Sequence, residues 1–203
     1  DDLLVLDKPA GLPAHGGSGH SAGVIELLRA LRPGADFLEL VHRLDRDTSG
    51  CLMIAKFRER LRHLHDALQR GTVDKRYLTL VAGRWPDDLR SIDLALADTR
   101  DNRGAGRARP AAGGKAALTQ FQVLRHLRRA TYLEVVLMTG RMHQIRAHAA
   151  SAGHPLAGDH RYGDPVFNRR ARRAGLQRLF LHAHLLNVPG GGDNDEEAIL
   201  VSA

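Results

Sequence analysis

The sequence contains a single cysteine, Cys51, among its 203 residues. No disulfide can therefore form within the chain, and a metal site built from several thiolates is excluded. So little cysteine is typical of proteins from a reducing compartment, and we expect a cytoplasmic protein. Because Cys51 opens an apolar run, we expect it to be a buried structural thiol.

Long apolar segments and targeting signals are also missing. No run approaches the roughly 18 apolar residues of a membrane helix, and no secretory signal is present. The chain starts with DDLLVLDKPAG, a strand-like pattern without an initiator methionine, so we expect a processed form or the core of a longer protein. Its 203 residues, 43% of them hydrophobic, suffice for one substantial domain or for two small lobes sharing a sheet.

Familiar metal and nucleotide motifs are absent too. The glycine-rich stretch HGGSGHSAG lacks the Gly-Lys-Ser/Thr ending of a phosphate loop and the dinucleotide-binding spacing. The 12 histidines include no HExxH motif, and His143 and His148 are five positions apart rather than four. Asp45 and Asp47 could hold magnesium, but Arg46 between them argues against a cation site. We therefore expect no metal and no cofactor.

Positive charge is plentiful. There are 30 Lys and Arg residues against 23 Asp and Glu, which gives a net charge of +7 and a pI near 10.3. Much of the excess is arginine, whose planar guanidinium suits phosphate recognition. A basic surface can serve solubility alone, but this balance favours a nucleic-acid partner.

The hydrophobic patterns predict strands and helices that alternate irregularly. We expect strands near 3–6, 38–41, 52–55, 77–81, 119–124, 131–138 and 178–186, and helices over 24–31, 58–69 and 143–152. Val24, Leu27, Leu28 and Leu31 form the predicted apolar face of the first helix. Segment 101–114 reads as a mobile basic loop, and four arginines cluster at 169–173. This order favours a mixed sheet with helices packed on it over a regular βαβ array.

The stretch VHRLDRDTSG places a dense group of charges between two apolar segments. A carboxylate such as Asp45 is costly there unless a cation or hydrogen bonds compensate it. A buried ion pair that fixes a loop and a functional carboxylate both remain open for Asp45. Residues 47–50 have good turn chemistry, and we expect a turn there.

A second group of polar residues lies in MTGRMHQIRAHAASAGHPLAGDHRYGD. Arg141, His143 and Arg146 crowd the start of the predicted helix, whose N-terminus attracts anions. Gln144 and His148 share one face of it, and Arg146 points elsewhere. A solvated helix face would explain this pattern, but the flanking apolar residues favour a helix packed at a cleft.

Lys75 and Tyr77 stand at the start of a predicted strand. A tyrosine in that position is most simply a core residue. Next to cations it could also stack on a nucleic-acid base.

Five segments occur in an order that resembles the motifs of the ribosomal large-subunit pseudouridine synthases, and the C-type members most closely. They are HRLDRDTSG, KRYLTLV, GRMHQIRAH, HPLAGDHRYGD and RLFLHAHLL. The resemblance runs from about residue 3 to residue 186. It implies an α+β fold with a largely antiparallel central sheet, flanking helices and loops, and one active-site cleft. It also implies an isomerase that converts uridines of 23S ribosomal RNA to pseudouridine without a cofactor or metal.

The resemblance implies roles for three residues. Asp45 matches the catalytic aspartate, Tyr77 the tyrosine that stacks against the flipped target base, and Arg146 the arginine that pairs with the catalytic carboxylate. Met142 and Ala147 stand where other hydrophobic or small residues are common in the family.

We further predict that Arg43, Arg141, His143 and Lys75 bind RNA. The expected partner is 23S ribosomal RNA, and we expect a monomer that binds no membrane. Related proteins usually carry an N-terminal S4 RNA-binding domain. We expect residues 1–203 to be the catalytic domain alone, without that module.

Two other classes of function share parts of this pattern. A non-catalytic RNA-binding or ribosome-assembly factor would explain the basic charge, but not the joint occurrence of Asp45, Tyr77 and Arg146. A glycoside hydrolase needs two carboxylates flanking one bond, whereas Asp47 is predicted to lie in a turn. The high basicity also argues against a neutral sugar substrate.

Overall fold

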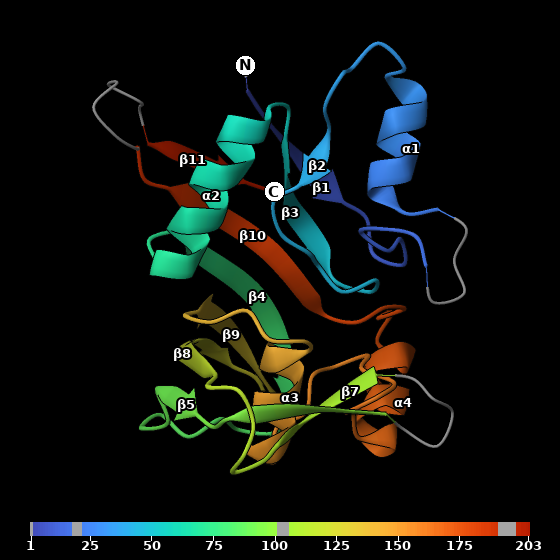
Figure 1. The fold of residues 1–203 in the computed structure, drawn as a ribbon. Helices are drawn as coiled ribbons and strands as arrows, with labels where there is room; N and C mark the ends of the chain where they lie inside the picture. Colours follow the sequence, from blue (N-terminus) through green and yellow to red (C-terminus); the bar gives the residue numbers. More distant parts are fainter. Residues whose placement is uncertain (1, 18–21, 101–105, 191–197) are drawn as a thin grey trace. The chain divides into compact units, whose positions relative to one another are not determined.

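The computed structural model describes residues 2–17, 22–100, 106–190 and 198–203 (Figure 1). It divides into two compact units. The first comprises residues 1–75 and 183–203, and the second comprises residues 76–182. The chain passes from the first unit to the second within one strand, β4, and returns within another, β10.

The fold is α+β, with largely antiparallel strand pairing, as expected. The helices are α1 (Val24–Leu31), α2 (Arg58–Arg70), α3 (Gln144–Ser151) and α4 (Pro165–Arg173). The strands are β1 (Leu3–Lys8), β2 (Glu39–Leu40), β3 (Ser49–Ala55), β4 (Asp74–Ala82), β5 (Ser91–Asp93), β6 (Leu96–Arg100), β7 (Gly106–Pro110), β8 (Leu118–His126), β9 (Ala130–Leu137), β10 (Leu181–Val188) and β11 (Ile199–Ser202). Within the described residues, no helix is long and apolar enough to cross a membrane.

The first unit is built around β3, all seven residues of which are buried. β1 and β2 pair antiparallel with β3, and β11 pairs with β10. The continuous apolar run 51–55 suits a strand that is covered on both faces. Its side chains pack with Leu64 and Ala67 of α2 and with Leu186 of β10. Cys51 is 1% exposed, which confirms the predicted buried thiol.

The helix predictions in this unit were right about position and partly wrong about orientation. α1 buries Val24, Ile25 and Leu28. Leu27 and Leu31, predicted to face the core, are 45% and 80% exposed. The apolar stripe of this short helix is wider than its contact area, so packing selects which edge of the stripe is covered.

The second unit contains a four-stranded antiparallel sheet in the order β4-β9-β8-β5 and a separate hairpin, β6–β7. The predicted basic loop is therefore wrong for 106–110, which form β7. The Ala108 side chain is buried beside Leu96 and Ala147, and this packing stabilises a segment of low strand propensity. The remaining part of that prediction at 101–105 lies outside the described residues.

Near the C-terminus, one strand boundary and one helix also differ from expectation. β10 begins at Leu181 rather than at residue 178. The cluster of arginines forms a helix, α4, which the hydrophobic pattern did not predict. The sequence did contain a signal for the start of this helix, because Asp164 caps it and Pro165 occupies its first turn.

Candidate active site

Asp45 lies in a tight turn immediately before β3. The amide of Thr48 donates a hydrogen bond of 3.1 Å to the Asp45 carbonyl, which closes the turn. The turn thus begins two residues earlier than predicted, because β3 already starts at Ser49, and Gly50 pairs with Lys8 of β1. The neighbouring Leu44 is 7% exposed and anchors the segment, while Asp45 itself is partly buried.

The backbone that follows Asp45 is held by two donors. The Arg46 carbonyl accepts hydrogen bonds from the Lys8 ammonium at 3.0 Å and from the Gly11 amide at 2.9 Å. The Lys8 ammonium also donates to the carbonyls of Pro9 and Leu12. Lys8 therefore ties the loop after β1 to the turn that carries Asp45.

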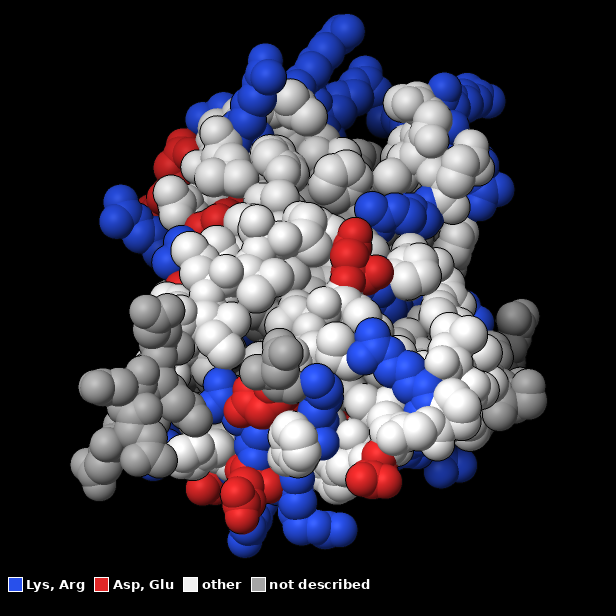
Figure 2. All heavy atoms as spheres, turned by 90° about the horizontal axis from the view of Figure 1, so that it is seen from above, with Lys and Arg blue, Asp and Glu red and all other residues white. Residues whose placement is uncertain are grey.

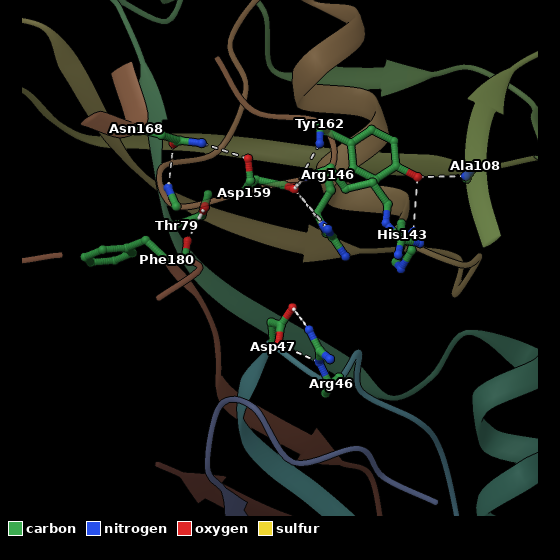
Figure 3. Close-up of polar contacts among 12 residues, drawn as sticks. Arg46, Asp47, Thr79, Ala108, His143, Arg146, Asp159, Tyr162, Asn168 and Phe180 are labelled. Carbon is green, nitrogen blue, oxygen red and sulfur yellow. Dashed lines mark hydrogen bonds and ion pairs between the residues drawn. The ribbon is translucent and has the colours of Figure 1, made fainter. Parts of the chain in front are cut away.

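Lys8 is a buried cation, with only 1% of its surface exposed. Burial lowers the pKa of Lys8 to about 8, against the opposing effect of the Asp47 and Asp45 carboxylates. The ammonium therefore supplies positive charge close to both carboxylates near neutral pH. Asp47 forms an ion pair with Arg46 at 2.9 Å, and the two side chains are 40% and 51% exposed (Figure 3).

His42 and Lys75 are electrostatically coupled within the first unit. The Met53 amide donates to His42 Nε2 at 3.1 Å, so His42 is neutral and its Nδ1 carries the proton. Burial lowers the pKa of His42 to about 4, with a further contribution from the charge of Lys75. Burial also lowers the pKa of Lys75. Arg43 of the same motif is exposed.

In the second unit, α3 is almost wholly buried, so its polar residues do not form a solvated face. Gln144 and His148 share one face, as predicted, and both contact Thr119 of β8. His148 Nε2 lies 2.9 Å from the Leu94 carbonyl, which can only accept, so Nδ1 accepts from the Thr119 hydroxyl. Gln144 also accepts from the Arg141 amide. These two side chains hold α3 against β8.

Arg146 points away from that face and forms a bidentate ion pair with Asp159. The Nε and Nη2 atoms of Arg146 donate to the two carboxylate oxygens of Asp159 at 2.8 and 3.0 Å (Figure 3). Burial opposes ionisation of Asp159, but the bonds and charge of Arg146, together with the amides of Tyr162 and Arg161, outweigh it and lower the pKa of Asp159. The guanidinium plane is therefore fixed by a partner that the sequence motifs did not identify.

Tyr162 completes this network. Its hydroxyl accepts from the Ala108 amide at 2.7 Å and lies 3.1 Å from His143 Nδ1 (Figure 3). The guanidiniums of Arg107 and Arg146 lie 4.8 and 5.1 Å from its ring centroid. His143 has φ 52°, a left-handed conformation that is uncommon outside glycine. This strained residue directs its ring toward Tyr162 at the start of α3.

Tyr77 is 6% exposed and pairs with Val135 across β4 and β9. The adjacent Arg76 forms an ion pair with Glu134 at 3.0 Å. Arg141 donates from its Nε to the Ala116 carbonyl, although its side chain is exposed. Asp45 belongs to the first unit and Tyr77 and Arg146 to the second, so the pairing of Arg146 with Asp45 stays a prediction.

Comparison with known proteins decides the family. A sequence profile described as RNA pseudouridylate synthase matches residues 2–151, a range that contains Asp45, Tyr77 and Arg146. The chain belongs to the RNA pseudouridylate synthase family. The family expected from the sequence motifs is thereby confirmed.

Relatives within this family are similar over most of the chain. The chain is 50% identical over 184 residues to ribosomal large subunit pseudouridine synthase C of Haemophilus ducreyi, a match covering 91% of this chain and 58% of that protein. It is likewise 50% identical over 197 residues to the protein of the same name from Escherichia coli K12, covering 95% and 62%. The chain thus spans about three fifths of the length of these relatives.

Solved structures of two human proteins share the pseudouridylate synthase fold. Human RNA pseudouridylate synthase domain containing 4 matches with a TM-score of 0.77 at 24% identity, covering all of this chain and 85% of that one. Human RNA pseudouridylate synthase domain containing 1 gives a TM-score of 0.73 at 25% identity, covering all of this chain and 79% of that one.

The sequence did not predict a structural role for three residues that the fold shows to be buried and hydrogen-bonded: Lys8, Asp159 and Tyr162. Lys8 stands in DKPAG, and Asp159 and Tyr162 stand in GDHRYGD, all within segments already singled out. A lysine next to a strand end and an aspartate in a polar loop carry no local sign of burial. Only their long-range partners, Arg46 for Lys8 and Arg146 for Asp159, distinguish them.

Proposed function

We propose that this chain isomerises specific uridines of 23S ribosomal RNA to pseudouridine in the cytoplasm, acting as a monomer and without a cofactor. One observation carries the proposal. The chain shares 50% identity over more than nine tenths of its length with proteins named ribosomal large subunit pseudouridine synthase C. The high basic charge supports an RNA substrate.

In this proposal Asp45 is the catalytic carboxylate. The target uridine must leave its stack before its C5 and glycosidic bond can be reached. The N1–C1′ bond breaks, the freed base rotates, and a C5–C1′ bond forms. The C5 proton is then lost and N1 gains one, so the reaction is a balanced isomerisation. The pinned turn around Asp45 suits this role, because it fixes the backbone on which the carboxylate stands.

The proposed partners of Asp45 act on its charge and on the base. Arg146 would orient the carboxylate and favour its anionic form. The bidentate bond to Asp159 supports this role, because it gives the guanidinium a defined plane. Tyr77 would stack on the flipped base, and its buried position supports a rigid platform. Arg43, Arg141, His143 and Lys75 are the proposed contacts to RNA.

The experiment that tests this proposal is tritium release from unmodified 23S ribosomal RNA transcribed with C5-tritiated uridine. Wild type is compared with Asp45→Asn, which keeps side-chain size and removes the charge. The matched control is Asp47→Asn, two residues away in the same turn, whose carboxylate is exposed and paired with Arg46. We expect release by wild type and Asp47→Asn and none by Asp45→Asn, with RNA affinity retained.

Release by Asp45→Asn would contradict the catalytic assignment. RNA binding by the wild type without any release would instead favour the non-catalytic RNA-binding alternative. Because the chain spans about three fifths of its relatives' length, that result has to be repeated with a chain of their full length.

A further inference from the structure

Helix α4 carries an unusual concentration of one charge. Four of its nine residues are arginines, and all four are largely solvent-facing: Arg169, Arg170, Arg172 and Arg173. Placed at 100° per residue, they occupy one side of the helix. Phe167, Asn168 and Ala171, which are partly buried, occupy the other side. The sequence therefore builds an amphipathic helix whose outer face is dominated by guanidinium groups.

No carboxylate balances this face. Among the described residues, none of the four arginines forms a salt bridge or side-chain hydrogen bond. The acid nearest in sequence, Asp164, caps the helix by accepting from the Phe167 amide. α2, by contrast, mixes its exposed arginines with Glu59 and Asp66. The face of the molecule drawn in Figure 2 likewise intersperses basic with acidic side chains around a broad uncharged area.

The arrangement is unfavourable for the isolated helix. The pairs 169–172, 170–173 and 169–173 are three or four positions apart, where like charges repel. Cations in the last turn gain from the helix dipole, but that gain fades within a turn and does not require four of them. A polyanion docked on this face would remove the repulsion. Arginine's planar fork matches phosphate oxygens in particular.

α4 is also firmly attached to the network that holds Arg146. The Asn168 amide group donates to the Asp159 carbonyl at 2.8 Å, and its oxygen accepts from the Gly158 amide at 2.9 Å (Figure 3). Asp159 in turn forms the bidentate pair with Arg146. A phosphate chain bound on the outer face of α4 would therefore be held at a set position relative to the Arg146 guanidinium.

We propose that the arginine face of α4 binds the phosphate backbone of the RNA substrate outside the target nucleotide. The helix is about 13 Å long, enough to follow a few consecutive phosphates. The inference rests on the proposed function for the identity of the RNA. In this proposal α4 contributes affinity for RNA but no sequence selectivity. Phosphate contacts position a nucleic acid and do not distinguish its bases.

The test uses residues 1–203 as the protein and unmodified 23S ribosomal RNA as the probe. The four arginines of α4 are replaced together by glutamine. The control replaces Arg62, Arg70, Arg128 and Arg129, which are also exposed, so that the net charge falls equally. RNA affinity is measured between about 0.1 and 0.3 M salt, where each lost phosphate contact lowers the slope of log K against log salt by about 0.7–0.9.

We expect the α4 variant to bind about tenfold more weakly or worse and to lose about two units of salt slope, with a much smaller change in the control. A variant with four lysines in place of the arginines should keep most of the slope. The midpoint temperature of thermal unfolding should be unchanged or higher in the glutamine variant, since the repulsion among the four arginines is removed. Equal affinity and slope in the α4 and control variants would overturn the proposal.

Tritium release separates this inference from the proposed function. At saturating RNA the α4 variant should release tritium at the wild-type rate, with a higher RNA concentration for half-maximal rate. A lower rate at saturation would contradict a pure docking role. Absence of release by wild type, and again by a chain of its relatives' full length, would refute the synthase function. The binding comparison would still decide whether α4 is an RNA-phosphate surface.

Discussion

Asp159 shows how one side chain can organise a site without being recognisable in the sequence. It is fully buried, accepts both bonds of Arg146, and accepts the amides of Arg161 and Tyr162. Tyr162 then contacts Ala108 of β7 and His143 at the start of α3. One carboxylate therefore connects the helix that carries Arg146 with the loop leading to α4.

Replacing Asp159 by asparagine should be costly. The substitution keeps an acceptor for the two amides but leaves the buried Arg146 guanidinium without the carboxylate it bonds twice. We expect the free energy of unfolding to fall by about 3 kcal/mol in urea titrations. Asp47→Asn breaks an exposed pair and should cost about 0.5 kcal/mol or less. Similar losses in the two variants would refute a structural role for the buried pair.

At the scale of elements, β3 depends on a glycine near its start. Gly50 has φ 108°, and a Cβ there would lie 2.2 Å from the Ala183 carbonyl oxygen of β10. Both the backbone conformation and the close strand approach therefore require glycine. The turn that carries Asp45 ends two residues before this contact, so strand packing and the geometry of the turn are linked.

Gly50→Ala should destabilise the protein by about 3 kcal/mol or more, because it combines backbone strain with a clash against main-chain atoms. Gly11→Ala is the matched control, since Gly11 also has a positive φ, 90°, but has open space where a Cβ would stand. That variant should lose only about 1–2 kcal/mol from strain. Chemical denaturation of both variants measures the difference, and equal losses would show that the close approach to Ala183 costs nothing.

At the scale of the whole molecule, each unit contains a histidine whose pKa is lowered. His42 of the first unit has its pKa lowered to about 4, and burial lowers the pKa of His148 in the second. The unfolded chain binds protons at these positions below about pH 6.5, whereas the folded chain does not. The contribution of these two histidines to folding stability is therefore fully present above that pH, and the His42 contribution is lost as the pH falls toward 4.

His42→Gln should reduce this acid sensitivity. Glutamine can keep an acceptor for the Met53 amide but does not titrate. Because His42 retains some exposed surface, we expect it to contribute about 1 kcal/mol per pH unit or less between about pH 6.5 and 4. Urea unfolding of wild type and variant across this range measures the slope. An unchanged slope in the variant would show that His42 is not the group responsible.

The sequence by itself determined the family, the α+β class and the identity of the candidate residues, because these depend on local motifs and on hydrophobic periods. The strand that follows Asp45 was predictable for the same reason. The tertiary structure alone decided which edge of α1 is buried, that 106–110 form a strand, and that Arg146 grips Asp159. Each of these three features depends on contacts with residues distant in the chain. Burial in those contacts, and not local propensity, decides which of the allowed conformations forms.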